Sequence, residues 1–467
     1  MCNVSLNGTQ PTDVSLRVLR ALEAAGLEAW YVGGWVRDAL MGCPSHDVDM
    51  CCSGLWQESK AALEAADIAV VESGIKFGGI TAISDGERIE VTTYRLDGFY
   101  TDGRHPQSVE RAASLEDDLA RRDFTVNAMA WHPERGLVDR YDGQGDLERK
   151  LIRAVGDPKR RFNEDALRML RAVRFACRLD FMIEPRTKLA LAECAPLLDA
   201  VARERVGIEL EGILSTGHGG DAMLRYPELI CAAVPELAAG RGFDQRSVYH
   251  AFNVYEHIAR VLTVAGELAL CDGVAPSMSL MWAAFLHDVS KPECFIVDHA
   301  GSGHFYGHPE LGAKKARVIM DRLALSHDLV RDVCLLIKYH DKPLRPERTC
   351  LLNMMRALSG EGVDTARLMD ELMDLKRADT LGKAPSCFYY VETIEEMRSL
   401  AHGLLAAGEP YTLKMLAING GDLIRAGVKP GPELGQLLNA ALDAVIEDNI
   451  PNDRETLLAH LNLGQLK

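Results

Sequence analysis

The stretch that decides the fold is YVGGWVRDAL at residues 31–40, followed by Asp47-Val48-Asp49. The first part predicts a strand, a glycine turn and the start of a helix. Two adjacent glycines let the backbone approach a ligand closely, and the amides that open the helix suit a phosphate. The second part predicts a strand with Asp47 and Asp49 on one face, because side chains two residues apart on a strand share a face.

Paired carboxylates of this kind are typical of a magnesium site. Asp47 and Asp49 can hold two Mg²⁺ ions about 3.5 to 4 Å apart, one activating an attacking hydroxyl and the other neutralising a departing pyrophosphate. An isolated Asp-x-Asp more often caps a turn, but the preceding Gly33-Gly34 turn and helix favour the metal site. Glu90, on a later strand-like segment, is the candidate third carboxylate; the alternative is an ordinary solvent-facing strand residue.

Length and composition limit the class of protein. The chain has 467 residues, enough for about three or four folding units. Its apolar runs are far shorter than the ~20 residues of a membrane-spanning helix, and no signal pattern opens the chain, so we expect a soluble, cytoplasmic protein without a membrane partner. The 12 scattered cysteines contain no CxxC pair and fit reduced thiols better than disulfides.

The charge argues against a protein that coats nucleic acid non-specifically. The formal net charge is −16, whereas such proteins carry a basic excess that neutralises phosphates. Any RNA contact must therefore be local, and the basic island at residues 153–178 is the one candidate. Its candidate RNA-binding residues are Arg171, Arg174 and Arg178. On charge alone, a solvated helix face is the more frequent explanation.

Strand-like segments and glycine-rich turns occupy the first third of the chain, which predicts an α+β region from about residue 27 to residue 154. The predicted strands are 29–32, 48–50, 80–83, 89–94 and 128–131. From Asn163 onward the apolar spacing of three and four predicts helices. We place breaks in this helical part at residues 217–220 and 345–348, where glycines and prolines interrupt the pattern.

Five motifs occur in order along the chain. They are Gly33-Gly34-x-Val36-Arg37-Asp38, Asp47-x-Asp49, EVTTYR at residues 90–95, RRDFTVNA at residues 121–128, and Glu164-Asp165-x-x-Arg168. In this order they resemble the motifs of class II tRNA nucleotidyltransferases, which belong to the polymerase β-like superfamily and are close relatives of bacterial poly(A) polymerase. One departure is Phe77-Gly78-Gly79-Ile80, where many members have His-Gly-Thr.

The resemblance implies a polymerase β-like head with a mixed sheet, followed by all-helical neck, body and tail domains. The implied bounds are 1–155 for the catalytic head, 156–220 for a neck that binds the base and RNA, 221–350 for the body, and 351–467 for a tail that binds tRNA. It also implies tRNA, CTP and ATP as partners, Mg²⁺ as cofactor, and nucleotide contacts from Gly33, Gly34 and Arg37.

Four polar residues of the fourth motif are candidates for ribose and triphosphate contacts. They are Arg121, Arg122, Asp123 and Asn127, since guanidinium groups suit phosphate and Asp or Asn suits sugar hydroxyls. The stretch 95–106 resembles the flexible loop that the family uses in switching from CTP to ATP. Its candidate residues are Arg95, Tyr100, Asp102 and Arg104. Such a loop argues against an enzyme that adds only CC; a simple exposed hairpin is the alternative.

The segment with Asp165 and Arg168 predicts how the base is chosen. Asn163 is expected to cap a helix, and Asp165 and Arg168 lie three residues apart, hence on one face. Cytosine and adenine both show an amino donor beside a ring-nitrogen acceptor, which one Asp/Arg pair fits. Guanine and uracil show the reverse and would mismatch at roughly 1 to 3 kcal/mol for each polar group. The alternative is a surface ion pair worth only a few tenths of a kcal/mol.

A second candidate site lies in the histidine-rich region between residues 250 and 340. Imidazole beside carboxylate is a common ligand set for divalent metals. Together with Lys291 and His308, the candidate ligands resemble those of the HD phosphohydrolase domain. The candidate ligands of this second divalent metal are His257, His287, Asp288 and Asp341. Relatives with this domain hydrolyse phosphoesters or retain it as a scaffold, and both alternatives stay open.

The sequence therefore favours template-independent addition of C, C and A to tRNA 3′ ends. Addition of the terminal A alone is an alternative. Poly(A) polymerase shares the head motifs but should carry a broader basic surface than this acidic chain. A further alternative is a different class of enzyme, a metal-dependent phosphohydrolase. In that case the HD-like region would be catalytic and the head would only bind nucleotide.

Overall fold

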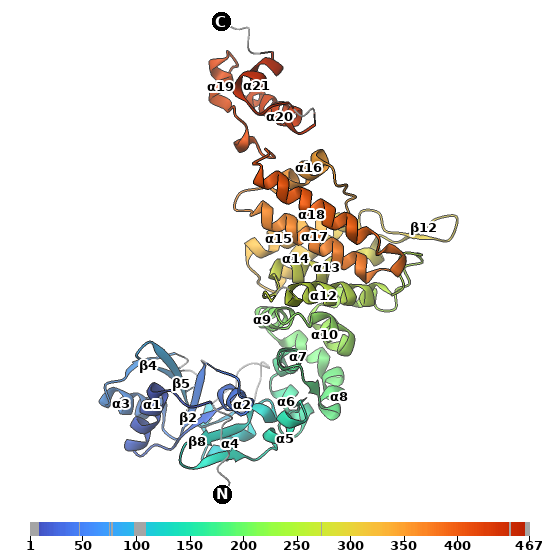
Figure 1. The fold of residues 1–467 in the computed structure, drawn as a ribbon. Helices are drawn as coiled ribbons and strands as arrows, with labels where there is room; N and C mark the ends of the chain where they lie inside the picture. The colour runs from blue at the N-terminus through green and yellow to red at the C-terminus, as the bar shows by residue number, and fades with distance from the viewer. Residues whose placement is uncertain are drawn as a thin grey trace. The chain divides into compact units, whose positions relative to one another are not determined.

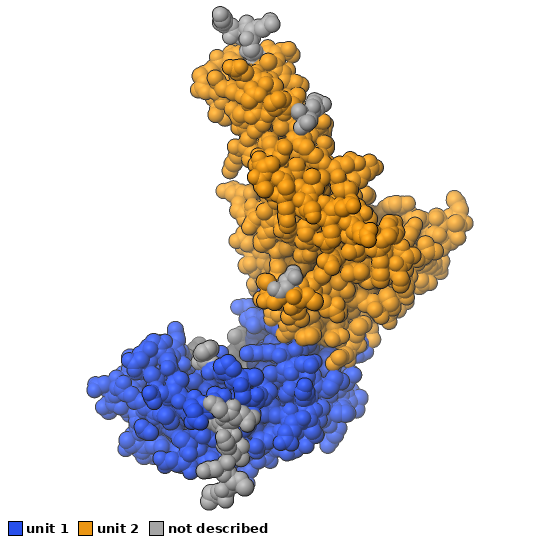
Figure 2. Space-filling view, in the orientation of Figure 1, with its two compact units in different colours: residues 1–213, 226–233 blue, residues 214–225, 234–467 orange. Residues whose placement is uncertain are grey.

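The computed structural model describes residues 9–45, 47–73, 75, 78–97, 109–271, 273–447 and 450–462. The chain forms two compact units (Figure 2). Unit 1 contains residues 1–213 and 226–233, and unit 2 contains residues 214–225 and 234–467. The division into four domains made from the sequence stays a prediction.

A mixed seven-stranded sheet forms the first part of unit 1 (Figure 1). The strand order is β3-β4-β5-β2-β1-β8-β9, and each neighbouring pair is antiparallel except β2 and β5. The strands are β1 (Ala29–Val32), β2 (Val48–Cys52), β3 (Ala69–Val71), β4 (Gly79–Ser84), β5 (Glu87–Thr93), β8 (Met129–His132) and β9 (Gly136–Asp139). The five strands predicted from the sequence are all present, with bounds within about two residues of those expected, as the period-two pattern requires.

The two faces of this sheet pack against different helices. These helices are α1 (Asp13–Ala24), α2 (Gly34–Leu40), α3 (Trp56–Ala65) and α4 (Leu115–Ala120). Met50 belongs to a core shared with α1, α2 and α3, whereas its neighbour Cys51 belongs to a second core shared with α4. Because successive strand residues point to opposite faces, Asp49 projects on the same side as Cys51, away from the first core.

The remainder of unit 1 is mainly helical. Its helices are α5 (Gly143–Glu148), α6 (Pro158–Glu164), α7 (Leu167–Leu179), α8 (Pro185–Cys194), α9 (Arg203–Leu214) and α11 (Pro227–Ala233). Its short strand pairs are β6 (Arg95–Asp97) with β7 (Val109–Arg111), and β10 (Leu151–Ile152) with β11 (Met182–Ile183). The helical prediction after residue 163 is therefore right except for two short ladders, one here and one in unit 2.

The prediction that Asn163 caps a new helix is wrong. Asn163 lies in the last turn of α6, where its Nδ2 donates to the carbonyl of Lys159 at 2.8 Å. The helix breaks two residues later because Asp165 takes an extended conformation (φ −145°, ψ 105°). The Oδ1 of Asp165 then accepts a hydrogen bond of 3.0 Å from the amide of Leu167, which opens α7.

Unit 2 is helical apart from one small hairpin. Its helices are α10 (Gly219–Arg225), α12 (Val254–Cys271), α13 (Met278–Leu286), α14 (His308–Arg322), α15 (His327–Tyr339), α16 (Arg348–Leu358), α17 (Thr365–Gly382), α18 (Tyr390–Ala406), α19 (Gly420–Arg425), α20 (Pro432–Glu447) and α21 (Arg454–His460). The hairpin pairs β12 (Ile296–Val297) with β13 (Gly303–His304). Helix α12 packs against α10, α13 and α17, and these contacts bring distant histidines together.

Two further observations bear on the expectations from composition. Among the helices of the described part of the chain, none has the length and apolar character needed to cross a membrane. The cysteines within the described residues are all free, and the adjacent Cys51 and Cys52 are both buried in the sheet.

Candidate active site

Three carboxylates gather where β2 and β5 run side by side. The two strands are parallel, and their register sets Asp49 directly opposite Glu90. Asp47 immediately precedes β2, two residues before Asp49, so alternation directs both side chains to one face. Ile89 and Val91 pack in the α1 core, which turns Glu90 to that same face. The structure thus brings the three predicted catalytic residues together.

Like charges crowd this part of the sheet. Burial raises the pKa of Asp49 to about 6, and the negative charges of Glu90 and Asp47 add to this effect, while Arg122 opposes it. Asp47 and Glu90 are exposed, so one partly buried and two exposed carboxylates share the face. A divalent cation would relieve their repulsion, and hard oxygen ligands are the donors that Mg²⁺ prefers. The donor set therefore fits a divalent metal.

The glycine turn lies against these carboxylates. Gly33 follows β1 with φ +68°, a conformation that other residues rarely adopt. A Cβ added there would lie 3.1 Å from Nη1 of Arg122 and 3.6 Å from Oδ2 of Asp49. The missing side chain at Gly33 keeps the backbone close to the acidic face, and Gly34 then opens α2. Gly33 thus borders Asp49, whereas a Cβ added at Gly34 would lie 3.6 Å from Nη2 of Arg37.

A buried network connects α2 to the neck helix α7. Arg37 is only 3% exposed; its Nη1 donates to Oδ1 of Asn127 at 2.7 Å and its Nε donates to Asp38 at 2.8 Å. Nδ2 of Asn127 donates to Oδ1 of Asp123 at 3.3 Å. The other oxygen of Asp123 accepts from Nε and Nη2 of Arg171 at 3.0 and 2.7 Å. Four residues predicted to bind nucleotide or RNA are therefore fixed by one another.

Arg121 and Arg122 share one buried carboxylate that the sequence analysis missed. Asp118 is fully buried, and its Oδ1 lies 2.5 Å from Nη2 of Arg121 while its Oδ2 lies 3.1 Å from Nη2 of Arg122. Burial alone would raise the pKa of Asp118, but Arg122 and Arg121 outweigh it and hold the pKa below its ordinary value. The only signal in the sequence was spacing, since Asp118 precedes the two arginines by three and four residues, and Arg121 and Arg122 directly follow the short helix α4.

Asp165 and Arg168 lie in the neck, and each is oriented by partners of its own. Oδ2 of Asp165 lies 3.4 Å from Nη2 of Arg205 on α9. Nη1 of Arg168 donates to Glu164 at 3.0 Å, and its Nη2 donates to the carbonyl of Arg121 at 3.1 Å. Arg168 therefore holds the backbone of Arg121, which directly precedes Arg122. The residue predicted to read the base is thus bonded directly to one of the two arginines predicted to bind the triphosphate.

The basic island is largely occupied by internal ion pairs. Nε of Arg174 lies 2.6 Å from Glu209 on α9, and its guanidinium also stacks on the ring of Phe175 at 4.7 Å. Arg171 pairs with Asp123, whereas Arg178 is exposed. Of the loop residues predicted from the resemblance, Arg95 begins β6 and its amide donates to Asp118 at 3.4 Å. Tyr100, Asp102 and Arg104, like Phe77, lie outside the described residues.

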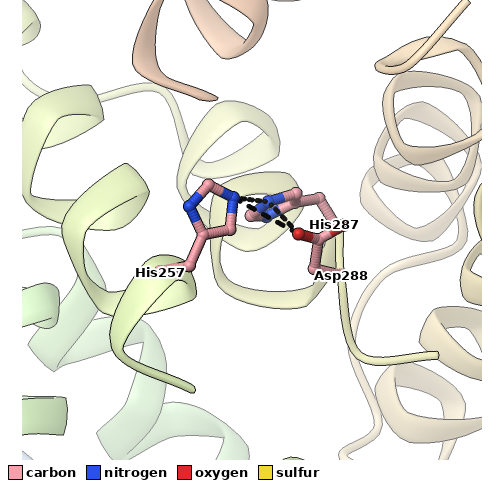
Figure 3. Close-up of side chains that lie close together, drawn as sticks. All are labelled: His257, His287 and Asp288. Carbon is pink, nitrogen blue, oxygen red and sulfur yellow. Dashed lines mark hydrogen bonds and ion pairs between the residues drawn. The ribbon is translucent and has the colours of Figure 1, made fainter. Parts of the chain in front are cut away.

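The histidine-rich region of unit 2 forms a second site. Figure 3 shows His257 from α12 facing His287 and Asp288, which follow α13. Nε2 of His257 and Nε2 of His287 lie 3.3 and 3.2 Å from Oδ2 of Asp288. All three residues are buried, and their ligand atoms lie within 4.8 Å of one another. The structure therefore brings together three of the four predicted ligands.

Two further histidines complete this cluster, and the sequence analysis did not list them as ligands. Nε2 of His308 and Nε2 of His340 lie 3.4 and 3.7 Å from Oδ1 of Asp288. Asp341 lines the adjoining pocket of about 280 Å³ but belongs to neither ligand group among the described residues, whereas its neighbour His340 does. The helix that ends at Tyr339 decides this, because it directs His340 inward.

Family models match three segments of the chain. A model described as poly A polymerase head domain matches residues 29–153, and one described as a probable RNA and SrmB-binding site of polymerase A matches residues 180–239. A third, described as a putative tRNA nucleotidyltransferase domain 2, matches residues 308–461.

Individual proteins are similar over nearly the whole chain. A CCA-adding enzyme of Limosilactobacillus fermentum is 32% identical over 445 residues, 94% of each chain. One of Streptococcus mutans is 31% identical over 447 residues, 95% of each chain. Among solved structures, the Bacillus stearothermophilus CCA-adding enzyme in complex with CTP has a TM-score of 0.70 at 25% identity, covering 97% of this chain and 98% of that one. The Thermotoga maritima CCA-adding enzyme complexed with tRNA shares the fold, with a TM-score of 0.59 at 22% identity, over 97% of this chain and 96% of that one.

Proposed function

The chain belongs to the CCA-adding enzymes, and we propose that Asp47, Asp49 and Glu90 are the carboxylates with which it works. It adds C, C and A, from CTP and ATP, to the 3′ end of tRNA. Nucleotidyl transfer in this family depends on a divalent metal, and the hard oxygens of the three carboxylates favour Mg²⁺. When bound, such a cation lowers the cost of ionising the attacking hydroxyl and of releasing pyrophosphate.

The reaction joins the 3′-oxygen of the RNA to the α-phosphorus and breaks the bond from that phosphorus to pyrophosphate. Asp47, Asp49 and Glu90 would hold the cation at this point. Arg121 and Arg122 would receive the triphosphate, because guanidinium groups donate paired hydrogen bonds to phosphate oxygens. Asp118 is a positioning residue in this scheme, since it orients both guanidinium groups from a fully buried site.

Base choice is assigned to the neck. Asp165 would accept from the amino group of C or A, and Arg168 would donate to the ring nitrogen. The position of Arg168 supports this assignment. Its side chain is 8% exposed and donates to Glu164, so it loses little conformational freedom when a base binds. Tyr100, Asp102 and Arg104 stay predicted loop residues, and Arg178 stays the predicted RNA contact of α7.

The single observation that carries the proposal is the pairing of Asp49 with Glu90 across β2 and β5, with Asp47 on the same face. The experiment offers purified protein three tRNAs, lacking CCA, ending in CC and ending in CCA, each with labelled CTP or ATP. We expect C to enter the first, A the second and neither nucleotide the third. Incorporation of A alone would indicate an A-adding enzyme, and long A tails would indicate poly(A) polymerase.

Substitutions test whether the three carboxylates, rather than other acidic residues of the head, are needed for nucleotide addition. Asp47→Ala and Glu90→Gln should abolish or strongly reduce addition, because the cation loses a ligand. Glu87→Gln is the matched control, since Glu87 lies on the same strand β5 but accepts a hydrogen bond of 2.7 Å from Thr12 instead. Undiminished addition by Asp47→Ala would contradict the assignment.

A second function is favoured for unit 2, namely hydrolysis of a phosphate ester by a second divalent metal. The observation that favours it is the convergence of His257, His287 and Asp288 in a buried position beside an open pocket. The test measures release of 4-nitrophenol from 4-nitrophenyl phosphate and from its bis ester, with Mn²⁺, Co²⁺ or Ni²⁺. His287→Ala should lose this activity and keep CCA addition, and Asp47→Ala should do the reverse. Absence of hydrolysis in the unmodified protein with every metal would leave the cluster a scaffold.

A further inference from the structure

We infer that Phe175 is a positioning residue of nucleotide addition, because its ring attracts three guanidinium groups that connect the neck to the head. The three groups belong to Arg37, Arg171 and Arg174. The inference goes beyond the proposed function and rests on it for one element, the reading of the base by Asp165 and Arg168.

Three residues on one face of α7 contact the head. Arg168, Arg171 and Phe175 follow one another at spacings of three and four, which places them on one side of the helix. Nη2 of Arg168 donates to the carbonyl of Arg121 at 3.1 Å. Nε and Nη2 of Arg171 donate to Oδ2 of Asp123 at 3.0 and 2.7 Å. Phe175 makes the third contact, so the place of Arg168 against the head depends on both contacts farther along the helix.

The ring of Phe175 lies among cations. It is 7% exposed and belongs to neither of the two apolar cores that pack on the sheet. The Cζ atoms of Arg37, Arg171 and Arg174 lie 5.3, 5.5 and 4.7 Å from the centroid of the ring. A guanidinium within about 6 Å of a ring centroid is attracted by the negative face of the ring. Phe124 packs edge to face against the same ring, with the centroids 5.9 Å apart.

Each of the three guanidinium groups also pairs with a carboxylate. For Arg37, Arg171 and Arg174 the N–O distances are 2.7, 2.7 and 2.6 Å, and the partners are Asp38, Asp123 and Glu209. A guanidinium can use its edge for a carboxylate and its face for an aromatic ring, so the two kinds of contact do not compete. Because the carboxylates balance the charges, the ring contributes orientation rather than neutralisation.

Arg37 carries the contact to the catalytic part of the head. It lies on α2, which begins directly after the turn at Gly33. Its Nη1 is held by Asn127, and a second restraint comes from the neck through the ring of Phe175. The ring therefore sets the distance between α7, which presents the base-reading arginine, and the glycine turn beside the carboxylates.

Helix α9 restrains the guanidinium of Arg174. A Cβ added at Gly212 would lie 2.4 Å from Cδ of Arg174, so the arginine side chain passes directly against this glycine. Its Nε lies 2.6 Å from Glu209, three residues earlier on the same helix. Arg174 is therefore held between α9 and the ring of Phe175, and it cannot shift far to replace a weakened contact with the ring.

The test replaces Phe175 in the full-length chain by phenylalanines with one, two and three ring fluorines, introduced at a suppressed stop codon. Fluorine withdraws electrons from the ring and weakens its attraction for cations, while the shape of the side chain stays nearly the same. On a tRNA that lacks CCA, we expect kcat/KM for CTP to fall with each fluorine, by about five- to tenfold in total. Rejection of UTP should weaken in the same order. Phe175→Leu should lose more, and Phe175→Tyr, which keeps an aromatic ring, should stay near the unmodified protein.

Phe181 is the matched control. It is also 7% exposed, lies just beyond the end of α7, and takes part in none of the cation–ring contacts found among the described residues. The same fluorinated residues at position 181 should leave kcat/KM unchanged, and thermal unfolding shows which proteins are folded. If kcat/KM does not depend on the number of fluorines at position 175 and falls only in Phe175→Leu, the side chain is an ordinary packing residue and the inference is overturned.

Asp165→Ala distinguishes this inference from the base-reading proposal. If Asp165→Ala relaxes nucleotide choice but fluorination at position 175 changes nothing, the base-reading proposal stands and the role of Phe175 is overturned. If Asp165→Ala still rejects UTP while kcat/KM falls stepwise with fluorine at position 175, the base-reading proposal fails. In that case the stepwise fall still supports Phe175 as the residue that positions the neck against the head.

Discussion

Arg37 donates a hydrogen bond of 2.7 Å to Asn127, although the two residues are separated by 90 positions in the chain. The bond is buried and connects the helix after the glycine turn to the short helical turn before β8. Asn127 passes the connection on to Asp123, and Asp123 to Arg171 on α7. The acidic face of the sheet and the neck are thereby held in one arrangement within unit 1.

Asn127→Ala should break the hydrogen-bonded connection between Arg37 and Asp123 and so disturb the position of α2 beside the acidic face. Arg37 would lose one buried acceptor, which costs about 1 to 3 kcal/mol, and addition should fall by about 10- to 100-fold. Thermal unfolding and initial rates of CTP incorporation measure the two effects. Asn163→Ala is the control, because Asn163 is exposed on α6 and bonds only within its own helix. Equal effects of the two variants would contradict the role given to the network.

Gly33→Ala should damage the site more than an equivalent change elsewhere. The left-handed conformation costs about 1 to 2 kcal/mol for a residue with a Cβ, and the new methyl group would also meet Arg122 at 3.1 Å. Gly26→Ala is the matched control, because Gly26 has φ +77° with no heavy atom within 4 Å of the added Cβ. Both variants should lose stability, Gly33→Ala the more because of the contact with Arg122, and Gly33→Ala alone should raise KM for CTP and ATP. Equal KM values for the Gly33→Ala and Gly26→Ala proteins would contradict a close approach of the nucleotide to the backbone at Gly33.

Asp165→Ala should relax nucleotide choice without loss of metal binding. The mismatch that excludes GTP and UTP is about 1 to 3 kcal/mol for each polar group, so discrimination should fall by about 10- to 100-fold. Competition between CTP and UTP for a tRNA that lacks CCA measures this ratio. Asp199→Ala, which removes an exposed ion pair with Arg203 in the same unit, should leave the ratio unchanged. Unaltered rejection of UTP by Asp165→Ala would end the base-reading assignment.

Asp118 should make the stability of the head depend on acid. Its pKa is lowered in the folded chain, so its contribution is present above the ordinary pKa of 3.8 and is lost as pH falls through the lower folded value. Asp118→Asn should lose about 3 to 5 kcal/mol at pH 7, because it removes a buried carboxylate that pairs with both Arg121 and Arg122. The loss should shrink below pH 4. Urea unfolding from pH 3 to pH 7 measures it, with the half-buried neighbour Asp117→Asn as control.

Much of the head could be predicted because short-range rules govern it. The period of two along β2 and β5 predicted that Asp47, Asp49 and Glu90 face one way, and the structure has them on one face. The turn predicted at Gly33-Gly34 is also present, and Gly33 has the positive φ that favours glycine. What the sequence did not reveal was the support behind these groups: Asp118 lies on a helix of six residues, too short for a clear periodic signal.

Long-range pairing explains the remaining differences. Arg171 and Arg174 looked like a basic surface, but their partners Asp123 and Glu209 lie 48 and 35 residues away in the chain. Asp341 was predicted as the fourth ligand from the resemblance to the HD domain, whereas its neighbour His340 lies in the cluster. The choice depends on which residue the end of α15 turns inward, and α17 contributes Asp379 from 122 residues beyond His257. Helix packing decides such positions, and local patterns carry little information about it.

The parallel register of β2 and β5 also determines which changes of length the head can accept in evolution or engineering. Residues can be inserted in the connection between the two strands without altering the pairing of Asp49 with Glu90. A single deletion inside β5 would bring an apolar neighbour, Ile89 or Val91, opposite Asp49 and turn its side chain to the wrong face. Length variation among homologous heads should therefore concentrate between residues 53 and 78 and be absent from residues 88–91.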